Sequence, residues 1–442
     1  MSMRERKKIQ KMLRKVENRK SKAWFVLDNA AKIYPAANTK RWSGMYRLSV
    51  RLKDLIQPDK LQEALAITIK RFPSFNIRMR KGVFWYYFES NATAVPIVMP
   101  DINNPCSPIR WKDNNGFLIR IFYYDKRIAI DYFHSITDGT GAMCFLKTLV
   151  AVYLRLNGVS IPATEGVLDV NSNASPGEYE DAFKKYANSK HRGRLKQHKA
   201  YHLKGSKMPL GDLGIITGIM PLSKLKVLAK QSGATLTEYF SALLLYSFYM
   251  KKQEKEPDRK PTWMAVSIPV NCRNYFKTET KRNFSLYLDP GIDTIMGEYT
   301  FAEILEQIQC YIKANLNTKM LNAMMTQNVR TERNIIIRIL PLFIKNFFML
   351  IAHKTIGYKY ITSTISNLGI VKVPKEMEPY VERFEFILGA SKIFTPCMAV
   401  VSYKDNLVVS FTSGIQETDI ERNFFTYLIK EGIPVKIESN KE

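Results

Sequence analysis

The sequence has few cysteines, no internal repeat and no low-complexity tract. Its five cysteines are scattered over 442 residues, their number is odd, and no C-x-x-C is present. This pattern argues against a disulfide framework and a structural zinc site, so we expect a reducing compartment and a cytoplasmic location. The N-terminus lacks the apolar run of about 7–15 residues that a secretory signal peptide requires, so we expect no such peptide.

Acidic residues are scarce relative to basic ones. The chain carries 67 Lys and Arg against 40 Asp and Glu, which gives a net charge of +27. Such a charge attracts polyanions: nucleic acid, an anionic membrane surface or a phosphate-rich cofactor. The sequence has no recognition-helix signature, no RNP-like aromatic motif and no zinc finger, so we expect no nucleic-acid partner.

The first 22 residues form a segment of their own. Ten of them are basic, and Ile9, Met12, Leu13 and Val16 recur at helical spacing. The segment 1–22 predicts a short basic amphipathic helix, which either makes peripheral contact with an anionic membrane or packs its narrow apolar stripe on the protein. The sequence leaves both alternatives open.

The most apolar stretch, residues 335–356, does not have the pattern of a membrane span. Arg338, Pro341 and Lys345 interrupt it. A spanning helix needs about 20 consecutive, mostly apolar residues with few charges. The stretch therefore predicts a buried helix or one that lies at an interface, and a greasy substrate is a further explanation of the same residues.

Length and element order indicate an α+β protein with two lobes. With 442 residues, 46% of them apolar, the chain has a globular composition and is too long for one ordinary core. Predicted strands and helices over 23–175 form the first lobe. The Lys- and Arg-rich stretch 176–207 is the predicted linker. Residues 208–442 form the second lobe, which opens with a strand and two helices.

One motif carries the main chemical signal. His134, Asp138 and Gly139 follow a hairpin predicted over residues 117–124 and 127–133, and they precede a predicted helix. A histidine just past a strand end can face a cleft, and its ordinary pKa of about 6.5 suits a general base. Gly139 allows the backbone or a ligand to approach closely.

The order of these elements resembles the chloramphenicol-acetyltransferase-like superfamily, which includes condensation domains, plant acyltransferases, wax-ester synthases and alcohol acetyltransferases. Its signature, H-H-x-x-x-D-G, is similar to the stretch from Phe133 to Gly139, with Phe133 in place of the first histidine. This replacement looks more like the small-molecule acyltransferase branches, above all the bacterial alcohol acetyltransferases, than like carrier-protein condensation domains.

Three further stretches support the resemblance, which covers about residues 22–435. Residues 52–80 look like the family's first helix and its following R-H-P-x-L-R turn, and residues 233–238 look like the start of the long second-lobe helix. Residues 267–273 look like the strand that ends in an arginine, here Arg273. Asn283-Phe284 looks like the family's G-N-F, with Arg282 in place of the glycine.

The resemblance implies two similar lobes, each a mostly antiparallel or mixed sheet flanked by helices, with His134 midway along an interlobe tunnel. His134 would be the general base for a small or lipophilic alcohol or amine that attacks an acyl-CoA thioester. Acetyl-CoA or another acyl-CoA is then a co-substrate, no cofactor stays bound and no metal is needed. The alternatives are a carrier-protein donor, or a catalytically silent, membrane-associated binding protein of this fold.

The resemblance also implies supporting roles. Asp138 points away from the substrate and pairs with Arg273 across the lobes; the alternative is a solvent-facing Asp138 that caps the next helix. Ser366 and Asn367 end a strand rich in hydroxyls and resemble the second-lobe segment near the tunnel. They are candidates for contact with the oxyanion, and a simple turn is the alternative explanation.

Overall fold

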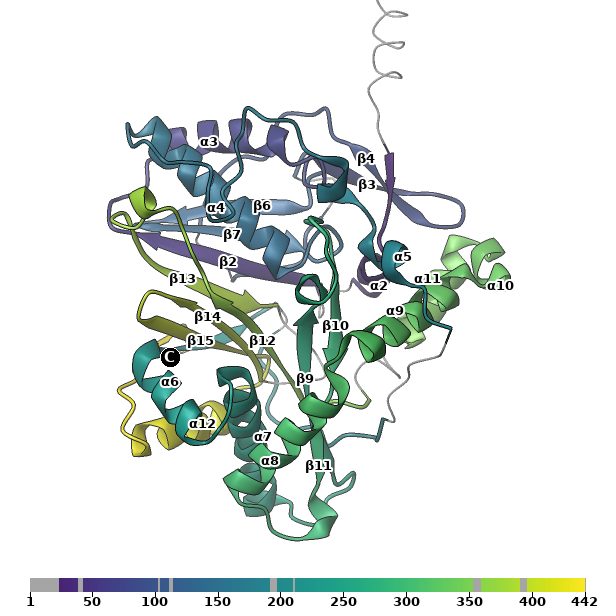
Figure 1. The fold of residues 1–442 in the computed structure, drawn as a ribbon, viewed down its shortest axis with the longest axis vertical. Helices are drawn as coiled ribbons and strands as arrows, with labels where there is room; N and C mark the ends of the chain where they lie inside the picture. The colour runs from purple at the N-terminus through teal and green to yellow at the C-terminus, as the bar shows by residue number, and fades with distance from the viewer. Residues whose placement is uncertain are drawn as a thin grey trace, which may run out of the picture.

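The structure, a computed structural model, consists of two lobes in which mixed sheets are flanked by helices (Figure 1). This is the predicted α+β class. The predicted N-terminal helix over 1–22 lies outside the part of the chain that the structure describes. The described residues are 24–38, 43–101, 104–110, 114–190, 197–209, 211–352, 359–389 and 396–441.

The first lobe is built on a five-stranded sheet in the order β13-β2-β7-β6-β5, with helices α3 and α4 on one face (Figure 1). A smaller sheet, β1-β4-β3, lies beside it. The elements are β1 (Trp24–Val26), β2 (Met45–Leu52), α3 (Pro58–Arg71), β3 (Ile77–Lys81), β4 (Tyr86–Ser90), β5 (Met99–Pro100), β6 (Ile119–Tyr124), β7 (Arg127–Phe133), α4 (Gly139–Leu156) and β13 (Val381–Leu388).

The predicted hairpin lies at the centre of this sheet. β6 and β7 pair antiparallel from Ile119 opposite Tyr132 to Tyr124 opposite Arg127. β7 is buried on both faces after Arg127, so the chain leaves the sheet at Phe133 in the interior of the molecule. By length and composition α4, which follows, is the one described helix that could cross a membrane, and most of it is buried in this lobe.

The second lobe is built on an eight-stranded mixed sheet. Seven strands run in the order β10-β9-β12-β14-β15-β8-β16, and β11 also pairs with β9. Thr235 is the N-cap of α7, and its side chain accepts a hydrogen bond from the Glu238 N–H at 3.2 Å. The elements are β8 (Gly214–Pro221), α6 (Leu222–Gln231), α7 (Leu236–Lys255), β9 (Trp263–Asn271), β10 (Ser285–Leu288), β11 (Gly291–Asp293), β12 (Ser363–Ile370), β14 (Cys397–Tyr403), β15 (Asn406–Ser413), α12 (Asp419–Lys430) and β16 (Lys436–Ser439).

A chain of helices leads from the second lobe back to the first (Figure 1). α11 packs against α2, and α9 packs against α5. Ala182 and Phe183 of α5 are buried in a small apolar cluster, so part of the predicted linker 176–207 is packed structure. The elements are α2 (Ile33–Ala37), α5 (Ala182–Tyr186), α8 (Phe301–Asn315), α9 (Thr318–Arg333), α10 (Ile335–Ile339) and α11 (Leu342–Ala352).

The second half of the chain contributes one strand to the sheet of the first lobe, which the sequence did not predict. β13 comes from the stretch 208–442, yet it pairs along β2 of the first lobe, with Val381 opposite Leu52 and Leu388 opposite Tyr46. Backbone hydrogen bonds therefore join the two predicted lobes, and the sheet of the first lobe is complete only with the second half of the chain.

The sequence left two alternatives for the stretch 335–356, a buried helix or one at an interface, and the described part, residues 335–352, is not a buried helix. α10 ends at Ile339, and Leu340 is extended at φ −59° and ψ 132°, because the proline ring of Pro341 disfavours a helical residue before it. α11 then begins at Leu342. Most of the apolar side chains on α10 and about half of those on α11 are exposed to solvent.

Candidate active site

His134 is the first residue after β7, and its position is fixed from several sides. Its N–H donates to the carbonyl oxygen of Gly44 at 2.9 Å. The ring stacks on Tyr34, with centroids 4.6 Å apart and planes 7° apart, and meets the edge of Tyr46 at 4.9 Å. The imidazole is therefore half-buried and held by aromatic faces from α2 and β2.

A cavity of about 350 Å³ opens beside this ring. Its size is that of a pocket for a small organic molecule. Five of the six predicted site residues line it, and the sixth, Arg273, contacts Asp138. The lining residues are Tyr46, His134, Asp138, Gly139, Thr140, Thr237, Pro269, Asn271, Asn274, Ser285, Tyr287, Thr364, Ser366, Asn367, Leu368, Gly369, Phe386 and Leu388.

Asn283 determines which ring nitrogen of His134 carries the proton. Nδ1 of His134 lies 3.1 Å from Oδ1 of Asn283, and Nδ2 of Asn283 donates to Oδ2 of Asp28 at 3.3 Å. A carboxylate only accepts, so the amide of Asn283 must turn its oxygen toward the ring. Nδ1 of His134 then holds the hydrogen, and Nε2 is left with a free lone pair.

The surroundings favour the neutral imidazole. Burial lowers the pKa of His134 below 6.5, against the raising effects of its own backbone carbonyl, Asp138 and Asn283. Burial also raises the pKa of Asp28 to about 6, although Arg282 opposes this shift. At pH 7 His134 is therefore an unprotonated base, and Asp28 is mostly ionised.

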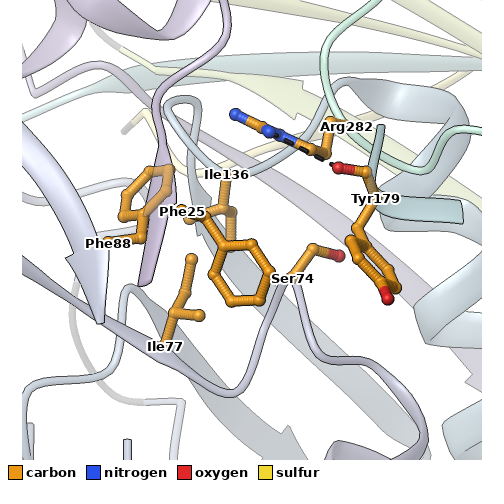
Figure 2. A pocket seen from close by; sticks show the side chains of 7 residues that line it. All are labelled: Phe25, Ser74, Ile77, Phe88, Ile136, Tyr179 and Arg282. Atoms are coloured by element: carbon orange, nitrogen blue, oxygen red, sulfur yellow. Dashed lines mark hydrogen bonds between the residues drawn. The ribbon is translucent and has the colours of Figure 1, made fainter. Parts of the chain in front are cut away.

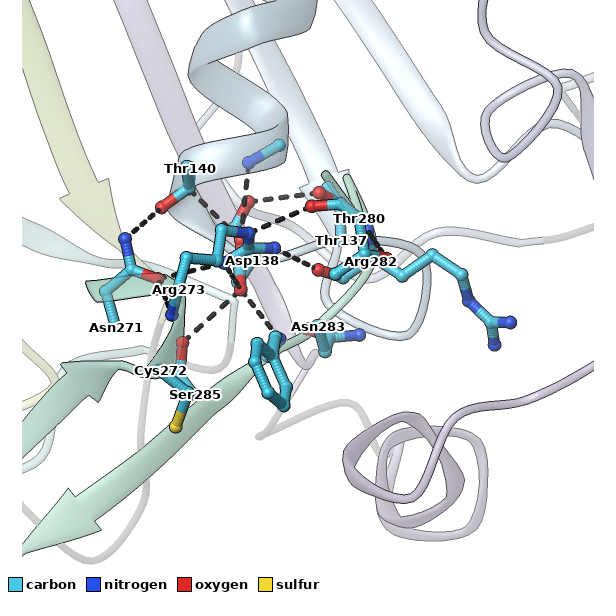
Figure 3. A network of polar contacts seen from close by, with 12 residues as sticks. Thr137, Asp138, Thr140, Asn271, Cys272, Arg273, Thr280, Arg282, Asn283 and Ser285 are labelled. Carbon is cyan, nitrogen blue, oxygen red and sulfur yellow. Dashed lines mark hydrogen bonds and ion pairs between the residues drawn. The ribbon is translucent and has the colours of Figure 1, made fainter. Parts of the chain in front are cut away.

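Asp138 is the centre of a network that joins the lobes (Figure 3). Its Oδ1 accepts from the N–H groups of Thr140 and Gly141, at 3.2 and 3.3 Å, and so caps α4. Its Oδ2 accepts from Nη1 of Arg273 and from the N–H of Phe284, each at 2.8 Å. One carboxylate thus closes the start of a first-lobe helix and binds the segment that enters β10.

Asp138 combines features of both sequence interpretations. It pairs with Arg273 and it caps the helix, but it is 5% exposed and does not face solvent. Burial would raise the pKa of Asp138, but Arg273 and the N–H donors outweigh burial and hold this pKa below its usual value. The carboxylate therefore stays ionised and bonded.

Two glycines let the second half of the chain approach the start of α4. A Cβ at Gly139 would lie 2.4 Å from Cδ2 of Leu368, and one at Gly141 would lie 2.0 Å from the carbonyl oxygen of Lys281. Any side chain at Gly141 would push the backbone of the 281–284 segment away. Gly139 was predicted for close approach, and Gly141 was not selected from the sequence.

The comparisons with known proteins agree with this architecture. The sequence profile of the alcohol acetyltransferase family matches residues 216–430, and no curated protein matches the sequence significantly. The trichothecene 15-O-acetyltransferase of Fusarium sporotrichioides is similar over 92% of this chain and 94% of its own, with a TM-score of 0.58 and 11% identity. The structure therefore has the fold that the sequence resemblance implied, and the family profile adds a match in the second half of the chain.

Condensation domains show the same fold. The first condensation domain of the calcium-dependent antibiotic synthetase is similar over 92% of this chain and 96% of its own, with a TM-score of 0.59 and 13% identity. The starter condensation domain of rhizomide synthetase, solved in complex with C8-CoA, covers 92% and 93%, with a TM-score of 0.59 and 11% identity. At these identities the likeness shows the fold of this chain and not its substrate.

On the second-lobe side of the site, Ser366 and Asn367 differ. Along β12, Thr364 and Ser366 line the cavity and Ile365 is buried in the second-lobe core, as the alternation of a strand requires. Asn367 donates to Oγ1 of Thr237 at 3.0 Å and accepts from the N–H of Gly369 at 2.8 Å. Asn367 thus forms the turn that was the alternative explanation.

The side chain of Ser366 is not held by hydrogen bonds of this kind. Among the described residues, its hydroxyl has no hydrogen-bond partner. A serine hydroxyl can donate one hydrogen bond to a developing oxyanion. Of the two residues predicted for contact with the oxyanion, Ser366 is therefore the better placed.

A second cavity is too small to be a substrate site. It measures about 10 Å³, roughly the space of one water molecule, and lies in the first lobe (Figure 2). Arg282 reaches its rim, where Nη1 contacts the carbonyl oxygen of Tyr179 at 3.5 Å. The lining residues are Phe25, Ser74, Ile77, Phe88, Ile136, Tyr179 and Arg282.

His198 and His202 of the predicted linker contact the second half of the chain, and His191 lies outside the described residues. His198 packs against Trp263, and Nε2 of His202 lies 3.1 Å from the carbonyl oxygen of Ile361. Across the described residues, no group of three or more His, Cys, Asp or Glu side chains could hold a metal ion.

Three residues of the site were missed from the sequence: Asp28, Tyr34 and Tyr46. They contact His134 directly or through Asn283, and each lies about 90 or more positions from the motif. Asn283 was noted for its resemblance to the family's G-N-F, but without a role. No periodic pattern marks such residues, because each is an ordinary side chain until the fold brings it to the ring.

Proposed function

We propose that the protein is an acyltransferase that moves an acyl group from coenzyme A to a hydroxyl or amine acceptor, with His134 as general base. One observation carries the proposal. The Nδ1 hydrogen of His134 is held by Asn283, which leaves Nε2 as the proton acceptor in a ring that lines a cavity between the lobes.

The proposed reaction needs no covalent enzyme intermediate. Nε2 of His134 takes the acceptor proton while the acceptor oxygen or nitrogen attacks the thioester carbonyl carbon. Ser366 donates a hydrogen bond to the oxyanion that forms. The C–S bond then breaks, and the imidazolium returns the proton to the departing thiolate, so the products are an ester or amide and free coenzyme A.

The charge of the chain supports a coenzyme A donor. A net charge of +27 favours a co-substrate that carries several phosphate charges. The solved rhizomide synthetase domain of the same fold contains C8-CoA. Phe133 stands where the family signature has its first histidine, and this favours a small-molecule acyltransferase over a carrier-protein condensation domain.

The five cysteines are free thiols, which supports the proposal of a reducing, cytoplasmic location.

The test is a thiol-release assay of the purified protein with acetyl-CoA and longer acyl-CoAs, across alcohols and amines. We expect His134→Ala to lower kcat/KM by roughly 10²–10⁴-fold and to leave the melting temperature nearly unchanged. His198→Ala is the matched control, because His198 is exposed and distant in sequence from the motif. Wild-type turnover in His134→Ala would exclude the general-base role.

The donor is tested separately. The same acceptors are offered with an acyl-phosphopantetheinyl carrier protein in place of acyl-CoA. Turnover with the carrier protein alone would move the assignment to a condensation-type enzyme. A well-folded protein that turns over neither donor would be a silent binding protein of this fold.

A further inference from the structure

α10 and α11 present an apolar face to solvent. Seven of their side chains are between 41% and 74% exposed, although hydrocarbon side chains of this size are usually covered. The members of this face, called the α10–α11 face below, are Ile335, Ile336, Ile339, Phe343, Phe347, Phe348 and Ile351.

The face extends onto the neighbouring β3–β4 hairpin and is held firmly from beneath. The N–H of Leu342 donates to the carbonyl oxygen of Val83 at 2.8 Å, and Val83 and Phe84 are 73% and 47% exposed. Nζ of Lys345 donates to the carbonyl oxygen of Phe84 at 2.9 Å and lies 3.8 Å over the Trp85 ring. Exposed apolar side chains of the hairpin therefore lie next to the start of α11, and Lys345 joins the two elements.

The charges around this face have one sign. Arg333 and Arg338 are exposed, and no Asp or Glu occurs from residue 334 to 352. The neighbouring acid, Glu332, is mostly covered and pairs with Lys32 and Lys184. Hydrocarbon bordered by cations is the surface of a helix that lies in the interface of an anionic bilayer.

We propose that the α10–α11 face docks the protein on an anionic lipid bilayer, with Phe343 and Phe347 among the acyl chains and Arg338 at the headgroups. The charge pattern argues against a second copy of the chain, because a symmetric dimer through this face would bring like charges together. The inference does not depend on the proposed catalytic function.

The docking face lies one helix away from the candidate active site. α11 packs against α2, and α2 carries Tyr34, whose ring stacks on His134. A bilayer that holds the α10–α11 face would therefore lie on the side of His134 that Tyr34 covers.

The experiment is co-sedimentation of the full-length protein with vesicles of phosphatidylcholine alone or with about one third phosphatidylserine. We expect the protein to sediment with the anionic vesicles and less as salt is raised. Phe343→Asp combined with Phe347→Asp should weaken partition by roughly tenfold or more. Ile295→Asp combined with Met296→Asp is the matched control and should bind as wild type. Both residues are exposed, and they follow β11, which lies apart from α10 and α11 (Figure 1).

Two further measurements assign the surface. Ile9→Asp combined with Leu13→Asp should retain most of the binding. Loss of binding in that pair, with retention in the Phe343/Phe347 pair, would make the N-terminal segment the anchor and overturn the proposal. Wild-type protein that ignores anionic vesicles, or that forms dimers in sedimentation velocity which the Phe343/Phe347 pair disrupts, would also overturn it. Unchanged melting temperatures of the variants show that the fold is intact.

Discussion

The two walls of the cavity differ in how their polar groups are bonded. On the first-lobe wall, both oxygens of Asp138 accept hydrogen bonds, and Nδ1 of His134 is bound to Asn283. On the second-lobe wall Asn367 is bonded too, whereas the Ser366 hydroxyl has no hydrogen-bond partner among the described residues and lines the same space. A general base works best when its tautomer and direction are fixed before substrate arrives, whereas an oxyanion donor acquires its partner only in the transition state.

The bonded wall should be the more sensitive to truncation. Asp138→Ala removes a buried carboxylate, so the charge of Arg273 loses its counter-ion and the N–H of Phe284 loses its acceptor. We expect a loss of roughly 3–5 kcal/mol in the free energy of unfolding, measured in urea. Glu378→Ala breaks an exposed ion pair with Lys404 and should lose no more than about 1 kcal/mol. Equal losses in both variants would show that the bonds of Asp138 stabilise the fold no more than an exposed ion pair does.

Substitution of Ser366 on the second-lobe wall should change activity and not stability. Ser366→Ala removes the proposed oxyanion donor, so we expect kcat/KM to fall by roughly 10²-fold with an unchanged melting temperature. Ser366→Thr retains the hydroxyl and should recover most of the activity. If Ser366→Ala turns over like wild type, the oxyanion donor lies elsewhere on the cavity wall.

The local sequence pattern was enough to predict the elements that carry His134 and Asp138. The hairpin, the helix α4 and the motif between them are contiguous in sequence, so strand alternation and the N-cap at Asp138 define them together. The contacts that orient the ring were not predictable in this way. Asp28 and Asn283 lie 106 positions before and 149 positions after His134, respectively, and only the tertiary fold brings them together.

Hydropathy alone also did not decide burial. α4 and α11 are both strongly apolar, yet α4 is sealed under α3 and the sheet while α11 covers α2 with one side and leaves the other exposed. β13 shows the same for strands, because no local feature of residues 381–388 indicates that they pair with β2. Partner choice between distant elements has no local signature.

Asn283 holds the hydrogen of the proposed general base, and its loss should have a moderate effect on kcat/KM. Asn283→Ala leaves the Nδ1 hydrogen without its amide acceptor, so both ring tautomers become populated and kcat/KM should fall roughly tenfold. The ¹⁵N chemical shifts of the His134 ring would report the mixture directly. A residue that only stabilised the fold would lower the melting temperature and leave the tautomer ratio unchanged.

The smallest effect expected is a displacement along the pH axis. Because burial lowers the pKa of His134, kcat/KM should be constant at neutral pH and fall as pH drops through a midpoint below 6.5. Asn283 raises this pKa, so Asn283→Ala should move the midpoint to still lower pH.

The melting temperature should not follow the same curve as kcat/KM. Protonation of His134 destabilises the fold as pH falls, but Asp28, with its pKa raised to about 6, stabilises the fold as it takes up a proton over the same range. If the melting temperature and kcat/KM fell together, acid unfolding and not titration of His134 would explain the lost activity.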